Sequence, residues 1–290
     1  MESGRILVAT DLSENARPAA VAGAKLAAKL QREVELIYVF DMTGYDGDKQ
    51  FRMFRDEERR QNVEKRIIEW YEKTVGEPPD AVTVDAGAPD AQIRERIAEG
   101  GVGWLMIGMS GRGAWSRLVF GSTALKLSGR PPSPTAVVHP EHHRVESGMT
   151  IGCGTDFTES SDVALERAAW FARSFDSTLR IVHSTPLPSK TVIREGELPE
   201  GMRRTAVVES ARESMDTFVR RNEEVLDGLD VQSRVIADHP VAGLRSFVED
   251  QGIDWLVLGH RRPQQRGGSK TVKGKWVQQM TCSTLLVPSG

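Results

Sequence analysis

The chain repeats its own landmarks, and this internal duplication constrains the fold more than any other feature of the sequence. Thr10-Asp11 recurs as Thr155-Asp156, at an offset of 145 residues. The segment 101–108 recurs as 252–259, at an offset of 151, with Gly, Trp, Leu and Gly in matching positions. Because both order and spacing are preserved, chance similarity explains the match poorly. The 290 residues therefore predict two copies of one domain.

Within each copy, short apolar runs alternate with stretches of helical periodicity, a pattern typical of βαβ units and a parallel sheet. The strands expected in the first half are residues 6–9, 34–40, 81–84, 104–107 and 135–139. The helices expected there are residues 16–30, about 50–74, 91–99 and one from about 119. Ser13 is the expected N-cap of the first helix. The second half repeats strands at residues 150–156, 179–183, 252–259 and 283–287.

The two halves differ in length between their second and fourth strands. We align Leu179–His183 with Glu35–Val39, and we assign the six extra residues to the Pro-containing segment 185–202, expected to be a mobile loop. The polar connector 140–148 separates the halves, which gives expected domains of residues 1–143 and 144–290.

A glycine-rich loop follows the fourth strand of the first half. Gly108, Gly111 and Gly121 are spaced by two and nine residues, and Ser122 comes next, before a helix-like segment. Glycine lets backbone approach an anion closely, and a helix N-terminus adds unpaired N–H groups. The spacing is neither a Walker A motif nor a close-spaced dinucleotide fingerprint. The loop indicates phosphate binding.

Composition excludes several classes of function. The net charge of −3 provides no overall basic field for nucleic acid. No apolar run reaches the length of a membrane span, and the N-terminus lacks a signal-peptide pattern, which favours the cytoplasm. Cys153 and Cys282 lie in or beside apolar runs and are expected to be buried thiols, not metal or redox ligands.

With these motifs, the whole chain resembles a tandem member of the universal stress protein (UspA) family. ATP-binding members carry Gly-x2-Gly-x9-Gly-(Ser/Thr), which Gly108, Gly111, Gly121 and Ser122 match without a gap. The resemblance implies two tandem doubly wound domains, each a five-stranded parallel sheet with about four helices, of Rossmann-like, adenine nucleotide alpha hydrolase-like fold. A ligand is then expected at the carboxyl ends of the strands, where the strand order reverses.

The resemblance also implies roles for single residues. Asp11 matches the strand-one Asp near ribose and adenine, and the backbone of Val39 matches the position that meets the adenine edge. The resemblance assigns the contacts with the ribose and the phosphates to the glycine-rich loop. The residues that make them are Gly108, Gly111, Arg112, Gly121, Ser122 and Thr123. ATP is the implied ligand, together with Mg²⁺.

Three of these residues have a structural alternative. Asp11 could be a helix N-cap, and both roles can coexist. Arg112 could be a solvated loop charge, and Val39 could be part of the core.

The second loop departs from the family pattern. Gly259 survives, but Arg262 stands at the second glycine position, Pro263 removes an amide donor, and Gly274 precedes Lys275 instead of Ser or Thr. We therefore expect the second half not to bind ATP. The loop is basic, through Arg261, Arg262, Arg266, Lys270, Lys273 and Lys275, so another anion is an alternative to a solvated charge run.

Four polar side chains of the second half follow predicted strands: Asp156, His183, His239 and His260. Carboxyl ends of parallel strands converge, so these residues could line one cavity and bind a transition metal or transfer a proton. The alternative is a degenerate pocket, because the spacing matches no metal motif.

The expected function is a cytoplasmic nucleotide-binding regulator or binding module that acts in the stress response through a protein partner. No Gly-x-Ser-x-Gly elbow is present, and no base is assignable to Ser110, Ser116 or Ser122, so at most slow ATP hydrolysis is expected. The alternatives are a nucleotidyl-transferring enzyme and a scaffold with structural ATP. The halves are expected to pair as a pseudo-dimer near their fifth strands, with a further homodimer as an option.

Overall fold

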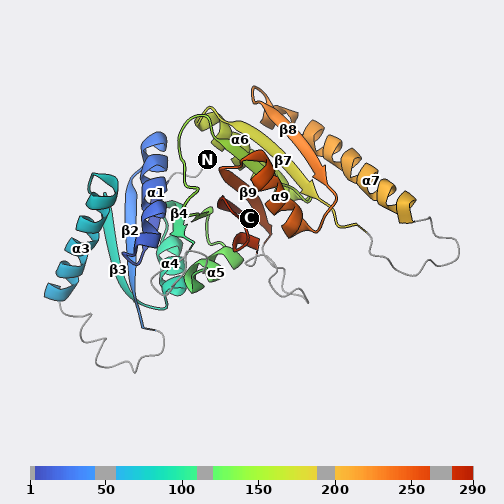
Figure 1. Cartoon of the computed structure of the whole chain (residues 1–290). Coiled ribbons are helices and arrows are strands. Elements are labelled where there is room, and N and C mark those ends of the chain that lie inside the picture. Colours follow the sequence, from blue (N-terminus) through green and yellow to red (C-terminus); the bar gives the residue numbers. More distant parts are fainter. Residues whose placement is uncertain (1–3, 43–56, 110–119, 188–199, 262–275, 290) are drawn as a thin grey trace.

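A computed structural model describes residues 4–42, 57–109, 120–187, 200–261 and 276–289. Ten strands form one sheet in the order β3-β2-β1-β4-β5-β10-β9-β6-β7-β8 (Figure 1). The strands of the first half are β1 (Arg5–Thr10), β2 (Val34–Asp41), β3 (Ala81–Gly87), β4 (Val102–Gly108) and β5 (Thr135–Val138). Those of the second half are β6 (Thr150–Gly154), β7 (Thr178–Ser184), β8 (Val231–Ile236), β9 (Trp255–Arg261) and β10 (Ser283–Ser289).

Each half is parallel within itself, and the strand order reverses beside its first strand. This confirms the doubly wound prediction. The halves meet where β5 pairs antiparallel with β10, through Ala136 and Leu285 at the centre of a three-pair ladder. Equivalent registers against β4 and β9 make these two residues counterparts, so a pseudo-two-fold axis passes between them. The fifth strands therefore form the join, as expected.

Helices cover both faces of the sheet. One face carries α1 (Arg17–Leu30), α3 (Glu57–Val75), α6 (Glu159–Ser174) and α7 (Glu200–Arg221) (Figure 1). The other carries α4 (Pro89–Ala98), α5 (Ser122–Gly129) and α9 (Pro240–Gln251). The short α8 (Glu223–Leu226) follows α7, and a 3₁₀ turn (Glu14–Ala16) precedes α1.

Alternation along the strands explains this layering. In β1, Ile6 and Val8 pack with the α1 face, whereas Leu7 packs with the α4 face. On α3, Ile67, Trp70 and Tyr71 are buried, as their helical spacing predicted. The predicted face members Phe51 and Phe54 lie outside the described residues.

The hydrophobic core on the α1 face of the sheet continues across the join between the halves. Trp104 of β4 lies 5.9 Å from Trp170 of α6, measured between ring centroids, and the guanidinium of Arg167 lies 5.3 Å from the ring centroid of Trp104. The two halves therefore share both a sheet and a hydrophobic core.

Several expected boundaries were wrong. The helix after the glycine-rich loop begins at Ser122, not near 119. Residues 200–202 belong to α7, not to the loop expected over 185–202, and 188–199 lie outside the described residues.

The strand registers correct the expected alignment of the second strands of the two halves. They pair Ile6 with Val34 in the first half and Ile151 with Leu179 in the second. They fix the offset between β2 and β7 at 145 residues, so the counterpart of Val39 is Ser184, not His183. The sequence misses this because the alignment that is slipped by one residue still matches apolar residues, such as Ile37 with Ile181.

Both cysteines are fully buried, and burial raises the pKa of each thiol to about 12. This confirms the expectation that both thiols are buried, and the raised pKa leaves little thiolate at neutral pH.

Candidate functional site

The turn after the first strand has the same geometry in both halves. In the first, Thr10 Oγ1 accepts a hydrogen bond from Leu12 N (2.9 Å), and Asp11 Oδ1 accepts one from Ser13 N (3.0 Å). In the second, Thr155 and Asp156 accept from Phe157 N and Thr158 N in the same way (2.9 and 3.2 Å). Leu12 and Phe157 both adopt positive φ, 63° and 65°. A non-glycine residue in this region is uncommon, so its repetition marks a specified turn at the carboxyl edge of the sheet.

The expected helix caps near this turn were wrong. The N-cap of α1 is Ala16, with Arg17 and Pro18 opening the helix. Ser13 caps only the 3₁₀ turn, and its hydroxyl makes no capping bond. Asp11 closes its own turn on Ser13 N instead of capping α1.

Val39 lies in β2, where it pairs with Asp85 of β3. Its side chain is half-buried and packs against the core on the α4 face of the sheet. The side chain therefore has the core role that the sequence left open, while the strand carries its backbone to the carboxyl edge.

Gly108 ends β4, and its lack of a side chain has a packing reason. A Cβ atom there would lie 2.7 Å from the carbonyl oxygen of Asn15, in the 3₁₀ turn after β1. Gly259, its counterpart, is tighter still, because a Cβ there would overlap the carbonyl oxygen of Ser160 in the first turn of α6. Both glycines are thus required by the close approach of the segment that follows the first strand of each half to the fourth strand, whether or not a ligand is present.

The end of the glycine-rich loop forms the start of α5. Gly121 is the N-cap, and its N–H donates to the carbonyl oxygen of Met109 (2.9 Å), which ties the loop end to the end of β4. Ser122 and Thr123 form the first turn, and no side chain caps it. The first amides of a helix have no intrahelical acceptor, so this turn presents N–H donors. Gly111 and Arg112 lie outside the described residues.

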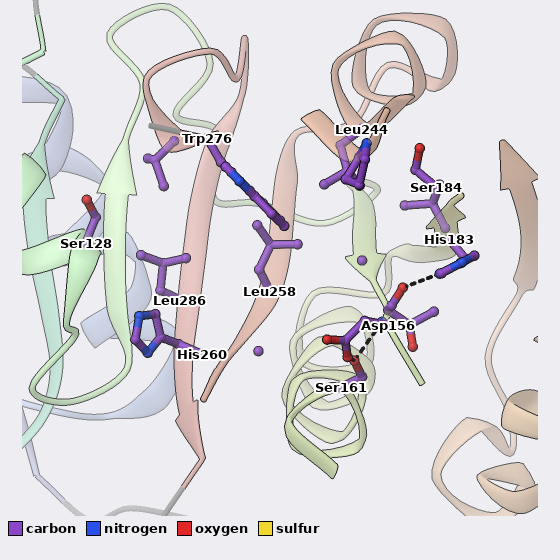
Figure 2. A pocket seen from close by; sticks show the side chains of 16 residues that line it. Ser128, Asp156, Ser161, His183, Ser184, Leu244, Leu258, His260, Trp276 and Leu286 are labelled. Atoms are coloured by element: carbon purple, nitrogen blue, oxygen red, sulfur yellow. Dashed lines mark hydrogen bonds between the residues drawn. The ribbon is translucent and has the colours of Figure 1, made fainter. Parts of the chain in front are cut away.

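In the second half, the corresponding edge holds a cavity of about 150 Å³ (Figure 2). Its described lining is mostly apolar, and polar groups lie at its ends. The lining residues are Ser128, Gly154, Thr155, Asp156, Ser161, Val182, His183, Ser184, Pro240, Leu244, Leu258, Gly259, His260, Trp276, Val277 and Leu286. Ser128 comes from α5 of the first half, and neither it nor Trp276 carried a sequence signal for this role. The basic loop residues from Arg262 to Lys275 lie outside the described residues.

The four polar residues expected to converge do so only in part. Asp156, His183 and His260 line the cavity, whereas His239 is the N-cap of α9 and does not. Figure 2 shows His260 on the side of Ser128 and Leu286, and Asp156 beside Ser161 and His183 across the cavity. Among the described residues, no group of three His, Cys, Asp or Glu side chains could hold a metal ion.

Hydrogen bonds fix these side chains. Asp156 Oδ1 accepts from the hydroxyls of Thr158 and Ser161, the latter at 2.7 Å. His183 Nδ1 lies 2.8 Å from the carbonyl oxygen of Thr155, and its ring packs against Phe157 with centroids 4.3 Å apart and planes tilted by 33°. His260 Nε2 lies 3.0 Å from the carbonyl oxygen of Gly129, so a residue of the second half holds the last carbonyl of α5.

The fold and these edges define a tandem doubly wound α/β protein with a candidate site at the carboxyl edge of each half. The model of the universal stress protein family matches residues 2–139 and 149–288, so the chain belongs to that family. This confirms the resemblance found in the sequence.

Solved structures share the tandem fold. A universal stress protein from Archaeoglobus fulgidus DSM 4304 is 17% identical, with a TM-score of 0.68 and full coverage of both chains. A protein of unknown function from Pseudomonas aeruginosa PAO1 is 15% identical, with a TM-score of 0.60, covering 98% of this chain and 92% of its own. No curated protein sequence matches the chain significantly. Among the described residues, no helix is long and apolar enough to span a bilayer.

Proposed function

We propose that the first half binds ATP, together with Mg²⁺, and that the chain acts as a nucleotide-dependent regulator or binding module in the stress response. Family membership supports a role in that response. The proposed ligand contacts are Asp11, Val39, Gly108, Gly111, Arg112, Gly121, Ser122 and Thr123.

The start of α5 is the observation that carries this proposal. Gly121, Ser122 and Thr123 begin a helix with no side-chain cap, beside the end of β4 and next to the strand-order reversal. N–H groups and the partial positive charge at such a terminus suit phosphate oxygens. The side chain of Asp11 follows β1, the strand beside β4, where it could meet the ribose or a bound Mg²⁺.

The second half is proposed to have lost this site. Its cavity of about 150 Å³ is smaller than the roughly 300 to 1,000 Å³ typical of ligand pockets. Trp276 lines it one residue after Lys275, close to the sequence position that corresponds to the start of α5. The indole gives this edge an apolar surface, which suits phosphate poorly.

The test is nucleotide binding by the purified chain. Mass spectrometry of released ligand and calorimetry with ATP, ADP, GTP and cAMP would identify the preferred nucleotide. The double variant Gly111→Val/Gly121→Val should lose ATP binding while remaining folded, because a branched side chain blocks close backbone approach. The matched change Gly274→Val in the second loop should leave ATP binding intact. ATP retained by the double variant, or lost in Gly274→Val, would contradict the assignment.

The same preparation separates the alternatives. Turnover of ATP to ADP, or transfer of AMP to an acceptor, would indicate an enzyme. Binding of a partner protein that does not respond to ATP would indicate a scaffold with structural ATP. We propose a cytoplasmic location and leave a homodimer of the tandem chain as an option.

A further inference from the structure

Histidines cluster where the two halves join. Three of the six histidines of the chain, His139, His142 and His143, form this histidine cluster, which begins directly after β5 and continues into the connector 140–148. His139 and His143 are half-buried, and the ring centroids of His139 and His142 lie 5.2 Å apart. A proton on one ring therefore raises the cost of a proton on the next.

The ring of His139 holds the start of the connector as a hydrogen-bond acceptor. Its Nδ1 accepts from the backbone N–H of Glu141 (3.2 Å), which closes a turn there. A ring nitrogen accepts only while it carries no hydrogen, and both nitrogens of an imidazolium carry one. A proton on His139 therefore cancels this bond and sets two N–H groups against each other.

His143 resists a proton for a different reason. Its Nδ1 is buried and has no hydrogen-bond partner. Protonation would place a buried N–H donor there without an acceptor, which is unfavourable. Burial lowers the pKa of His143 below its ordinary value; the backbone of Pro140 opposes this effect, and the charge of Lys25 in α1 adds to it.

The charges around the histidine cluster do not offset its burial. Burial lowers the pKa of His139, the two neighbouring histidines lower it further, and Glu141 raises it by less. The described charged groups on the elements around the cluster are Lys25 of α1, Asp254 beside β9, and Glu141, Arg144 and Glu146 of the connector. Because the folded-state pKa values are lowered, the rings destabilise the closed state only as pH falls below the unfolded pKa.

The second half holds the connector beside these rings. The hydroxyl of Ser283 in β10 accepts from the backbone N–H of His139 (3.0 Å) and donates to the carbonyl of His142. The indole N–H of Trp255 in β9 donates to the carbonyl of Arg144 (2.6 Å). These contacts fix the connector in the conformation in which the ring of His139 is an acceptor.

We propose that the histidine cluster is an acid-sensitive latch between the two halves. At neutral pH the uncharged rings keep the connector closed on Ser283 and Trp255. In acid, protonation of His139 and His143 breaks the turn at Glu141, and the connector leaves the second half while the ladder between β5 and β10 stays paired. Histidine suits such a switch because it changes charge near neutral pH. The latch requires no nucleotide, so it does not depend on the proposed ATP site.

Hydrogen exchange of the Trp255 indole N–H tests the latch in the full chain. This group is buried and bonded to Arg144 of the connector, so it exchanges only when the connector opens. NMR should show its protection, corrected for the intrinsic effect of pH on exchange, falling severalfold between about pH 7.5 and about pH 5.5. The amides of β1 should keep their protection, which separates local opening from global unfolding. Unchanged protection of the indole, or an equal loss in β1, would overturn the proposal.

Histidine titration in the same samples tests the cause of the opening. The imidazole signals of His139 and His143 should titrate with midpoints below the ordinary value of 6.5, because the closed latch disfavours charged rings. The protection of the Trp255 indole should fall over the same pH range. Midpoints at or above the ordinary value would contradict the latch.

The variant His139→Asn separates the acceptor from the charge. An Asn side chain can accept a hydrogen bond from the N–H two residues further on, but it does not take up a proton. The variant should therefore retain most of the indole protection at about pH 5.5. The matched change His239→Asn, at the exposed N-cap of α9, should leave the acid response as in wild type. An acid response of wild-type size in His139→Asn, or a lost response in His239→Asn, would place the switch elsewhere.

Discussion

Glu35 is a buried carboxylate in strand β2, where its buried neighbours are apolar or aromatic. Arg96 of α4 binds it through two hydrogen bonds of 2.6 and 2.7 Å, and Thr83 of β3 adds a third of 2.8 Å. Burial by itself raises the pKa of Glu35, but the hydrogen bonds from Arg96 and Thr83 and the charges of Arg96 and Arg5 outweigh burial and hold this pKa below its ordinary value. The counterpart in β7 is Arg180, so the duplication has not preserved this ion pair.

Removing the charge of Glu35 should destabilise the protein. We expect Glu35→Gln to lower the free energy of unfolding by about 3 kcal/mol, because it leaves the guanidinium of Arg96 without its buried partner. Glu33→Gln removes a solvent-exposed partner of Arg5 and should cost less than about 1 kcal/mol. Chemical denaturation measures both values. Similar losses in the two variants would show that the buried pair stabilises the fold no more than the exposed pair does.

The same pair should make stability depend on pH. Because the folded-state pKa of Glu35 lies below its unfolded value, its contribution is present above the unfolded pKa and is lost as pH falls through the folded pKa. The difference in unfolding free energy between wild type and Glu35→Gln should therefore shrink as the pH falls through this range. Denaturation series at several acidic pH values would reveal it, and a constant difference would contradict it.

At the scale of elements, α5 links the two candidate sites. Its first turn carries Ser122 and Thr123, while its end lines the second cavity through Ser128 and accepts a hydrogen bond from His260 at Gly129. One short helix of the first half is therefore fixed at its carboxyl end by the second half.

Loss of that contact should loosen α5. We expect His260→Ala to lower the protection of α5 amides against hydrogen exchange by about 1 kcal/mol, the usual net value of one hydrogen bond. If α5 holds phosphate as proposed, ATP affinity should fall severalfold as well. Exchange mass spectrometry tests the first effect without ATP, so failure of the proposed function would not obscure it. Unchanged protection in α5 would show that the contact with His260 does not hold the helix.

At the scale of the whole molecule, the join is a continuous sheet and a shared core. The β5 residues Thr135–Val138 are buried because β10 covers that edge, and Trp104 is covered by α6 of the other half. A first half on its own would expose both an unpaired strand edge and an aromatic patch.

The isolated segment 1–143 should therefore self-associate through β5. Light scattering at micromolar concentration should give the mass of a dimer, with one copy taking the place of the second half. Val137→Pro removes an amide that faces the β10 edge, since the carbonyls of Pro134 and Val138 face β4, and it should return the fragment to a monomer. A monomeric wild-type fragment would show that the join depends on features specific to the second half.

The duplicated landmarks and the alternation of apolar runs with helical periods sufficed to predict two copies of a parallel α/β domain, and the family resemblance added the doubly wound order. Backbone hydrogen bonding and burial of apolar faces act locally and therefore leave a periodic signal. They also predicted the strand-end positions of Asp11 and Gly108. The sequence could not reveal that Glu35 meets Arg96, that Gly259 is required by the carbonyl of Ser160, or that His239 does not line the cavity with Asp156 and His183. These depend on contacts between residues far apart in the chain, and packing in three dimensions alone decides which side chains meet.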